Sequence, residues 1–83
     1  MHPFTKRIST TIGPADFTFN RMFSVDGTIY HVAVSDNEKQ TLFFNMVRRS
    51  HNWKIVLAPL SPGWILDVES ELSQAINDQH IEV

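Results

Sequence analysis

The sequence contains no cysteine, and this absence excludes both a disulfide framework and a thiolate metal site. Its three glycines are isolated from one another, so no glycine-rich loop is available to hold a phosphate group. No apolar stretch approaches the roughly 18 residues that a membrane-spanning helix needs. The chain is therefore a small fold without disulfide or thiolate-metal cross-links, and its stability must come from an apolar core or from a partner chain.

An excess of charge of one sign is also missing. The 83 residues carry seven Lys and Arg against nine Asp and Glu, a formal net charge of −2. No whole-domain field therefore favours nucleic acid or an anionic membrane. Residues 1–12 include two cations but no apolar region long enough for a signal peptide. We expect a cytoplasmic protein that does not contact membranes.

The side chains that usually carry chemistry are present but scattered. None of the histidines has a second histidine at metal-ligand spacing. Several carboxylates gather on one predicted helical segment and mostly face solvent, whereas general acid–base catalysis needs a carboxylate in a cleft. No Gly-x-Ser-x-Gly motif positions a nucleophile. We expect a non-enzymatic protein with no catalytic residues, no cofactor and no metal.

Hydrophobic periodicity predicts strands first and a helix last. Alternating apolar residues mark four β-type segments, at residues 16–25, 28–35, 41–48 and 53–58, and Asp26-Gly27 is a strong hairpin signal. After Ser61 as N-cap and Pro62 as the first helical residue, the apolar stripe has helical spacing: Ile65, Val68, Leu72 and Ile76. The predicted fold class is α+β, a four-stranded antiparallel meander with one C-terminal α-helix packed on one face.

Residues 1–15 are predicted to form an N-terminal arm ahead of a single domain over residues 16–83. The arm is rich in threonine and ends at Gly13-Pro14, which is typical of either a flexible segment or an edge strand stopped by a turn. Phe4, Ile8 and Ile12 have a spacing compatible with alternation. The arm could therefore fold back and cover the second face of the sheet.

The second face of the predicted sheet is only partly polar, although the face opposite a helix usually meets water. Three interpretations stay open: the arm covers it, it contacts a second copy or another protein, or its apolar residues are scattered singly. Leu66 lies off the helical stripe and is either exposed or tucked under the preceding loop. The candidate interaction surface comprises Met22, Phe43, Val47, Val56 and Leu66.

Arg21 conflicts with the pattern, because it falls on the inward face between Phe19 and Phe23. A buried guanidinium needs a carboxylate or several carbonyl acceptors. Either Glu69 on the helix supplies that partner, or a bulge near Arg21 turns the side chain outward.

A second functional hypothesis starts from a local group of cations. Arg48, Arg49 and Lys54 lie close to Phe43 and Trp53 in the sequence, and proteins that bind single strands combine basic grooves with stacking aromatics. The other cations are spread along an acidic chain. Contact with a protein or with a second copy is therefore the first expectation, and single-stranded nucleic-acid binding is the alternative.

The order of elements, four strands and then a helix over residues 16–80, is similar to the single-strand DNA-binding coactivator fold. Subunits of that fold dimerise through the helix and use the sheet. No motif of that family matches residue by residue. The segments Trp53-Lys54-Ile55-Val56, Pro62-Gly63-Trp64-Ile65 and Leu72-Ser73-Gln74-Ala75-Ile76 resemble small uncharacterised bacterial proteins of meander-plus-helix type. This resemblance implies the fold and a bacterial origin, and it implies no activity.

Overall fold

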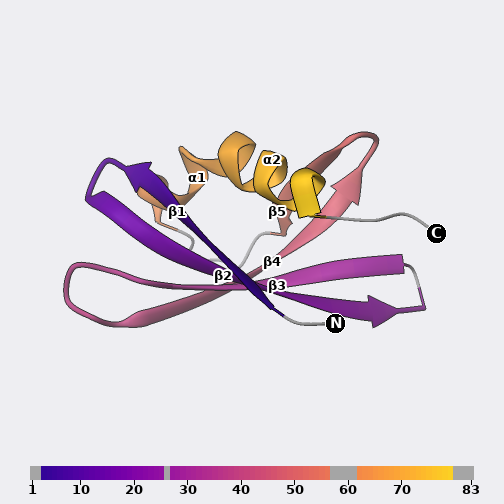
Figure 1. Ribbon diagram of the computed structural model, residues 1–83, viewed down its shortest axis with the longest axis horizontal. Helices are drawn as coiled ribbons and strands as arrows, with labels where there is room; N and C mark the ends of the chain where they lie inside the picture. Colours follow the sequence, from indigo (N-terminus) through magenta and orange to yellow (C-terminus); the bar gives the residue numbers. More distant parts are fainter. Residues whose placement is uncertain (1–2, 26, 57–61, 80–83) are drawn as a thin grey trace.

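The described chain forms an antiparallel sheet with a helical region on one side (Figure 1). The computed structural model describes residues 3–25, 27–56 and 62–79. The strands are β1 (Phe4–Thr10), β2 (Gly13–Ser24), β3 (Gly27–Ser35), β4 (Thr41–Arg49) and β5 (Asn52–Val56), followed by the helices α1 (Gly63–Leu66) and α2 (Glu69–Gln79). The sheet order is β1-β2-β3-β4-β5, so each strand pairs with its neighbours in the sequence. The predicted α+β class with an antiparallel meander is confirmed.

The predicted number of strands is wrong, because the described residues form five and not four. The segment expected as an arm contains β1, which pairs with β2 from Phe4↔Phe19 to Thr10↔Gly13. Gly13 has φ of 107°, a conformation that suits glycine, and it allows the chain to reverse between the two strands. Pro14 is tolerated in β2 because it lies beyond the β2–β3 register, which starts at Phe17↔Val34.

The core lies between the helices and the inner face of the sheet. Phe17, Phe19, Val32 and Met46 are almost completely buried on this face, and Trp53 on β5 is 1% exposed. The β1 residues Phe4 and Ile8 also belong here: Ile8 is buried, and Phe4 stacks on Phe19 with ring centroids 4.6 Å apart. The expectation that the arm covers the second face is therefore wrong, because the large apolar side chains of β1 point to the helix side.

The predicted helical stripe is buried, but the helix is interrupted. Ile65, Val68, Leu72 and Ile76 are all 5% exposed or less. α1 ends at Leu66, and the Val68 amide bonds to the carbonyl three residues back, at Ile65, instead of four. Pro62 is the N-cap residue and Gly63 starts the helix, one residue later than predicted. The predicted N-cap Ser61 and the strand end at residues 57 and 58 lie outside the described residues.

The α2 helix also closes one edge of the sheet. β5 is an edge strand, and two of its backbone amides donate to α2 side chains: Ile55 N–H to Glu69 Oε2 at 2.9 Å and Trp53 N–H to Ser73 Oγ at 2.8 Å. Asn77, one turn further on, accepts from Trp53 Nε1 and donates to the carbonyl of His51. The backbone amides of Trp53 and Ile55, which could otherwise pair with another strand at this edge, are therefore hydrogen-bonded within the chain.

Candidate interaction surface

The outer face of the sheet, the side opposite the helices, brings together four of the five residues predicted as an interaction surface. Strand alternation and the register place Met22 of β2, Phe43 and Val47 of β4 and Val56 of β5 on this face. Phe43 is 59% exposed, Met22 51% and Val56 42%. Val47 is half-buried between its neighbours. The sequence pattern predicted this grouping without knowledge of the register.

The outer face is organised in rows that run across the strands. The central row, called here the His31 row, contains Asn20, His31, Asn45 and Val56, which are partners in consecutive strand pairs. On one side of it lies the Phe43 row, with Thr18, Ala33 and Phe43. On the other side lies the Met22 row, with Met22, Ile29, Val47 and Lys54. Apolar side chains thus flank a polar centre.

His31 is the centre of the outer face. Its ring stacks on Phe43, with centroids 5.5 Å apart and planes inclined by 16°. Its Nδ1 lies 2.8 Å from Oδ1 of Asn45, directly opposite on β4. These two contacts fix the imidazole against β4 and leave Phe43 as the most exposed aromatic of this face. The partner of His31 could not be predicted, because the pairing of a histidine with an asparagine on a neighbouring strand depends on the register.

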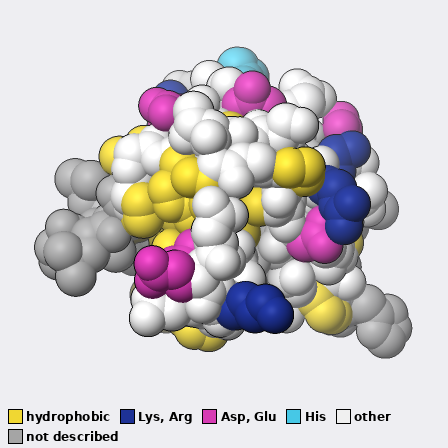
Figure 2. Space-filling model, turned by 90° about the vertical axis from the view of Figure 1, so that its left-hand side faces the viewer, with side chains coloured by type: hydrophobic (Ala, Val, Ile, Leu, Met, Phe, Trp, Pro, Cys, Tyr) yellow, Lys and Arg dark blue, Asp and Glu magenta, His cyan; other side chains and the backbone are white. Residues whose placement is uncertain are grey.

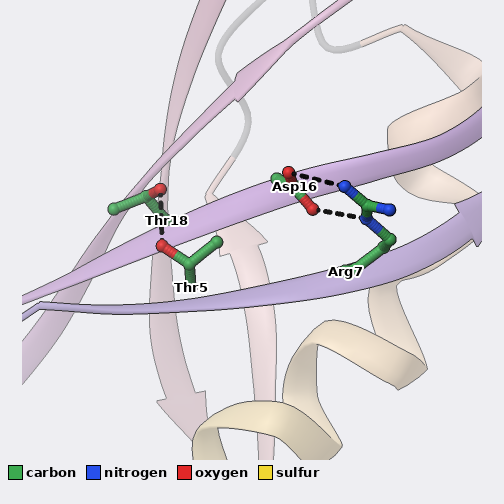
Figure 3. Close-up of polar contacts among 4 residues, drawn as sticks. All are labelled: Thr5, Arg7, Asp16 and Thr18. Carbon is green, nitrogen blue, oxygen red and sulfur yellow. Dashed lines mark hydrogen bonds and ion pairs between the residues drawn. The ribbon is translucent and has the colours of Figure 1, made fainter.

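Polar contacts make up the β1 side of the outer face (Figure 3). Thr5 and Thr18 share a hydrogen bond at 3.1 Å, and Arg7 donates from Nε to Asp16 Oδ1 at 2.9 Å. This bond, together with the charge of Arg7, holds the pKa of Asp16 below its usual value, and Asp16 raises the pKa of Arg7. Both side chains are exposed, so solvent screens the pair. The pair therefore forms a polar margin of the face.

The three cations predicted as a nucleic-acid contact do not form one cluster. Arg48 pairs in register with Trp53 on the helix side of the sheet, and its Nε donates to the carbonyl of Ser50. Arg49 and Lys54 lie on the outer face, and Lys54 Nζ also lies 3.6 Å from Glu69 Oε1 at the β5 edge. Adjacent residues of a strand point to opposite faces, which separates Arg48 from Arg49.

Leu66 does not belong to the outer face. It lies at the end of α1, on the helix side of the sheet, and is 42% exposed; residues 57–61 of the preceding loop lie outside the described residues. Seen from the end of the molecule that carries α1 and the turn between β1 and β2, hydrophobic side chains gather in the middle of the surface and charged ones lie around them (Figure 2). Nearby, Trp64 packs against the core, with its ring centroid 6.3 Å from that of Phe17.

Arg21 stays on the inner face, and neither explanation predicted for it is correct. The β2–β3 register runs without interruption from Phe17 to Ser24, so no bulge turns Arg21 outward. Glu69 contacts the β5 amide of Ile55 and Lys54 instead. The guanidinium carbon of Arg21 lies 5.1 Å from the ring centroid of Phe23, which is 74% exposed.

Among the described residues, no three His, Asp or Glu side chains lie close enough together to hold a metal ion. In the same part of the chain, no helix is long and apolar enough to cross a membrane. Comparison with protein-family models, curated proteins and solved structures found no match for the chain. The resemblances to the coactivator fold and to bacterial meander-plus-helix proteins stay predictions, and so do the bacterial origin and the cytoplasmic location.

Proposed function

We propose that this domain acts by protein contact through the outer face of its sheet and does not catalyse a reaction. The observation that carries the proposal is the position of Phe43. It is 59% exposed, beside the His31 row on a face that also presents Met22 and Val56, while the buried core of the described residues lies on the other side of the sheet.

Phe43 makes no contribution to the buried core cluster. Large aromatic side chains that become buried on association are frequent hot spots of protein interfaces. Exposed apolar residues are ordinary when they occur singly, but here several share one face, which is typical of an interaction surface. The stack on His31 restricts the ring before association, and this lowers the entropy lost when a partner covers it.

The test compares Phe43→Asp with a matched control, Leu66→Asp. Both residues are exposed and apolar, but Leu66 lies on α1, away from the outer face. Each variant is first compared with the wild type by thermal unfolding, where both are expected to stay folded. Association is then measured by sedimentation of the pure proteins over a concentration series and by recovery of proteins from a lysate. Only Phe43→Asp should weaken association; equal binding by all three proteins would contradict the proposal.

Single-stranded nucleic acid is a second candidate, supported by one specific observation. Phe43 offers an exposed ring on the same face as Arg49 and Lys54, and bases stack on such rings in sheet-based binders. Arg48 lies on the other side of the sheet, so only Arg49 and Lys54 of the three predicted cations can attract a phosphate backbone to this face, and the electrostatic attraction is weak. Anisotropy of a labelled oligonucleotide at low ionic strength tests it: binding that decreases with salt and is lost in Phe43→Ala would support this candidate.

A further inference from the structure

We infer that the occupant of the outer face is a second copy of this chain, related by a twofold axis along the His31 row; this inference rests on the proposed function. Antiparallel sheets that pack face to face lie about 10 Å apart with their strands within about 30° of one another. A twofold axis along the His31 row reverses the strand direction, so the Phe43 row of one copy faces the Met22 row of the other.

The two rows complement each other in size, strand by strand. On β3, the small Ala33 faces the larger Ile29 of the second copy, and on β4, the large Phe43 faces the smaller Val47. On β2, Thr18 faces Met22. A twofold axis repeats each of these contacts, so in these two rows each bulky side chain meets a smaller one on both sides of the axis, and each residue of the His31 row faces its own copy. This alternation is the kind of fit that close packing between two sheets requires.

The ends of β4 complement each other in charge. Asn45 is the middle residue of Thr41–Arg49, so an axis at Asn45 places Arg49 over Thr41 of the second copy. The hairpin that precedes Thr41 carries Asp36 and Glu38 against a single cation, Lys39. Arg49, which is exposed, therefore approaches an acidic hairpin at each end of the interface. Attraction of this kind sets orientation more than affinity.

The area of the face is sufficient for a dimer only when most of it is used. With strands about 4.8 Å apart and residues about 3.3 Å apart, β2 to β5 present roughly 600 Å². Stable interfaces bury about 600–1,000 Å² on each partner, so the face is at the lower limit. An axis along the central row gives the largest overlap of the two faces. A dimer of moderate affinity is therefore expected.

The other surfaces of the sheet are less suited to a second copy. The inner face holds the core, and the β5 edge donates its Trp53 and Ile55 amides to α2. The β1 edge carries the exposed side chains of Lys6 and Arg7, and charged side chains on an edge strand oppose pairing with another strand. The outer face is left as the surface that is both open and self-complementary.

A cross-linking experiment tests the register directly. The chain has no native cysteine, so Thr41→Cys and Arg49→Cys introduce unique thiols at the margin of the interface. In the proposed dimer, position 49 of one copy faces position 41 of the other, while the two copies of position 49 lie roughly 26 Å apart along the strands. A short bis-maleimide that spans about 10 Å should therefore link a mixture of the two variants and neither variant alone.

Sedimentation of the wild-type protein over a concentration series accompanies the cross-linking. We expect a reversible dimer whose dissociation constant rises at least about tenfold in Phe43→Asp and is unchanged in Leu66→Asp. If Arg49→Cys alone cross-links as readily as the mixture, the proposed register of the dimer is wrong. The proposed function is then still supported. A wild type that stays monomeric at every concentration overturns the second copy as occupant. The proposed function then depends on whether proteins recovered from the lysate require Phe43.

Discussion

Ser73 on α2 accepts a hydrogen bond of 2.8 Å from the backbone amide of Trp53 on the edge strand β5. Glu69, one helical turn earlier, accepts from Ile55 N–H, and Asn77, one turn later, accepts from the indole of Trp53. Residues spaced by four lie on one side of a helix. α2 therefore presents a polar stripe to β5 beside its apolar stripe, and this polar stripe takes the place of a sixth strand.

Ser73→Ala tests how much this edge contact stabilises the fold. The substitution removes the acceptor of the Trp53 amide in a buried position and leaves a polar group unsatisfied. The free energy of unfolding should fall by about 1–3 kcal/mol. Urea denaturation measures the loss, and hydrogen exchange should show faster exchange at the Trp53 amide.

Ser70→Ala is the matched control, because Ser70 lies on the same helix but is exposed, and among the described residues its hydroxyl bonds to Glu71 and not to β5. Its substitution should change the stability by less than about 0.5 kcal/mol. Alanine has a higher helix propensity than serine, so propensity alone would stabilise both variants. Equal stability losses in the two variants would therefore contradict the assignment of the Ser73→Ala effect to the contact with β5.

The alternation of apolar residues predicted the sheet well, because one buried face gives a strong signal of period two. The common inner face of Phe17, Val34 and Met46 follows from this alternation. The register does not, because Ser24 pairs with Gly27, whereas the predicted two-residue turn at Asp26-Gly27 would pair Val25 with Thr28. For residues 1–15 the edge-strand alternative is the correct one, but the pattern could not decide it against a flexible segment, because β1 has only two large apolar residues, Phe4 and Ile8. An edge strand that contributes so little to the core has a weak pattern.

The side-chain contacts between α2 and β5 and on the outer face could not be predicted in the same way. Glu69 and Asn77 read as ordinary polar residues of a helix, and their role depends on the distance between α2 and β5, which no local pattern encodes. Similarly, the stack of His31 on Phe43 joins residues of two strands and requires the register. The grouping of Met22, Phe43 and Val47 was predictable because side-chain direction alternates along every strand.

Gly13 and Gly63 should respond in opposite directions to alanine. Gly13 has φ of 107° in the turn before β2, where a side chain is strained even though a Cβ atom meets nothing within 4 Å. Gly13→Ala should therefore lower the free energy of unfolding by about 1–3 kcal/mol. Gly63 starts α1 and is equally uncrowded, so Gly63→Ala should stabilise the protein by about 0.4–1 kcal/mol. Thermal unfolding of the two variants beside the wild type measures whether each substitution raises or lowers the stability. A Gly13→Ala protein as stable as the wild type would show that the turn can adopt another conformation.

Tyr30 makes the stability of the fold sensitive to alkaline pH. Its ring is 3% exposed and contacts Trp53 edge to face, with centroids 5.0 Å apart. Burial raises the pKa of Tyr30, and the nearby charge of Arg21 opposes this rise only in part. A tyrosine in an unfolded chain ionises near pH 10. The unfolded state therefore loses its proton first, and stability present below about pH 10 is lost as the pH rises toward the higher pKa of the folded state.

The chain has a single tyrosine, so the absorbance of tyrosinate reports this residue alone. We expect the folded protein to titrate at higher pH than the protein in urea. Urea denaturation of the wild type and of Tyr30→Phe, repeated from pH 8 to about pH 11, separates this effect from the titration of lysines, which both proteins share. The wild type should lose stability more steeply above about pH 10 than Tyr30→Phe. Parallel losses in the two proteins would show that the hydroxyl of Tyr30 ionises as easily in the folded state as in water, and that the ring is not held against Trp53 in the way its burial requires.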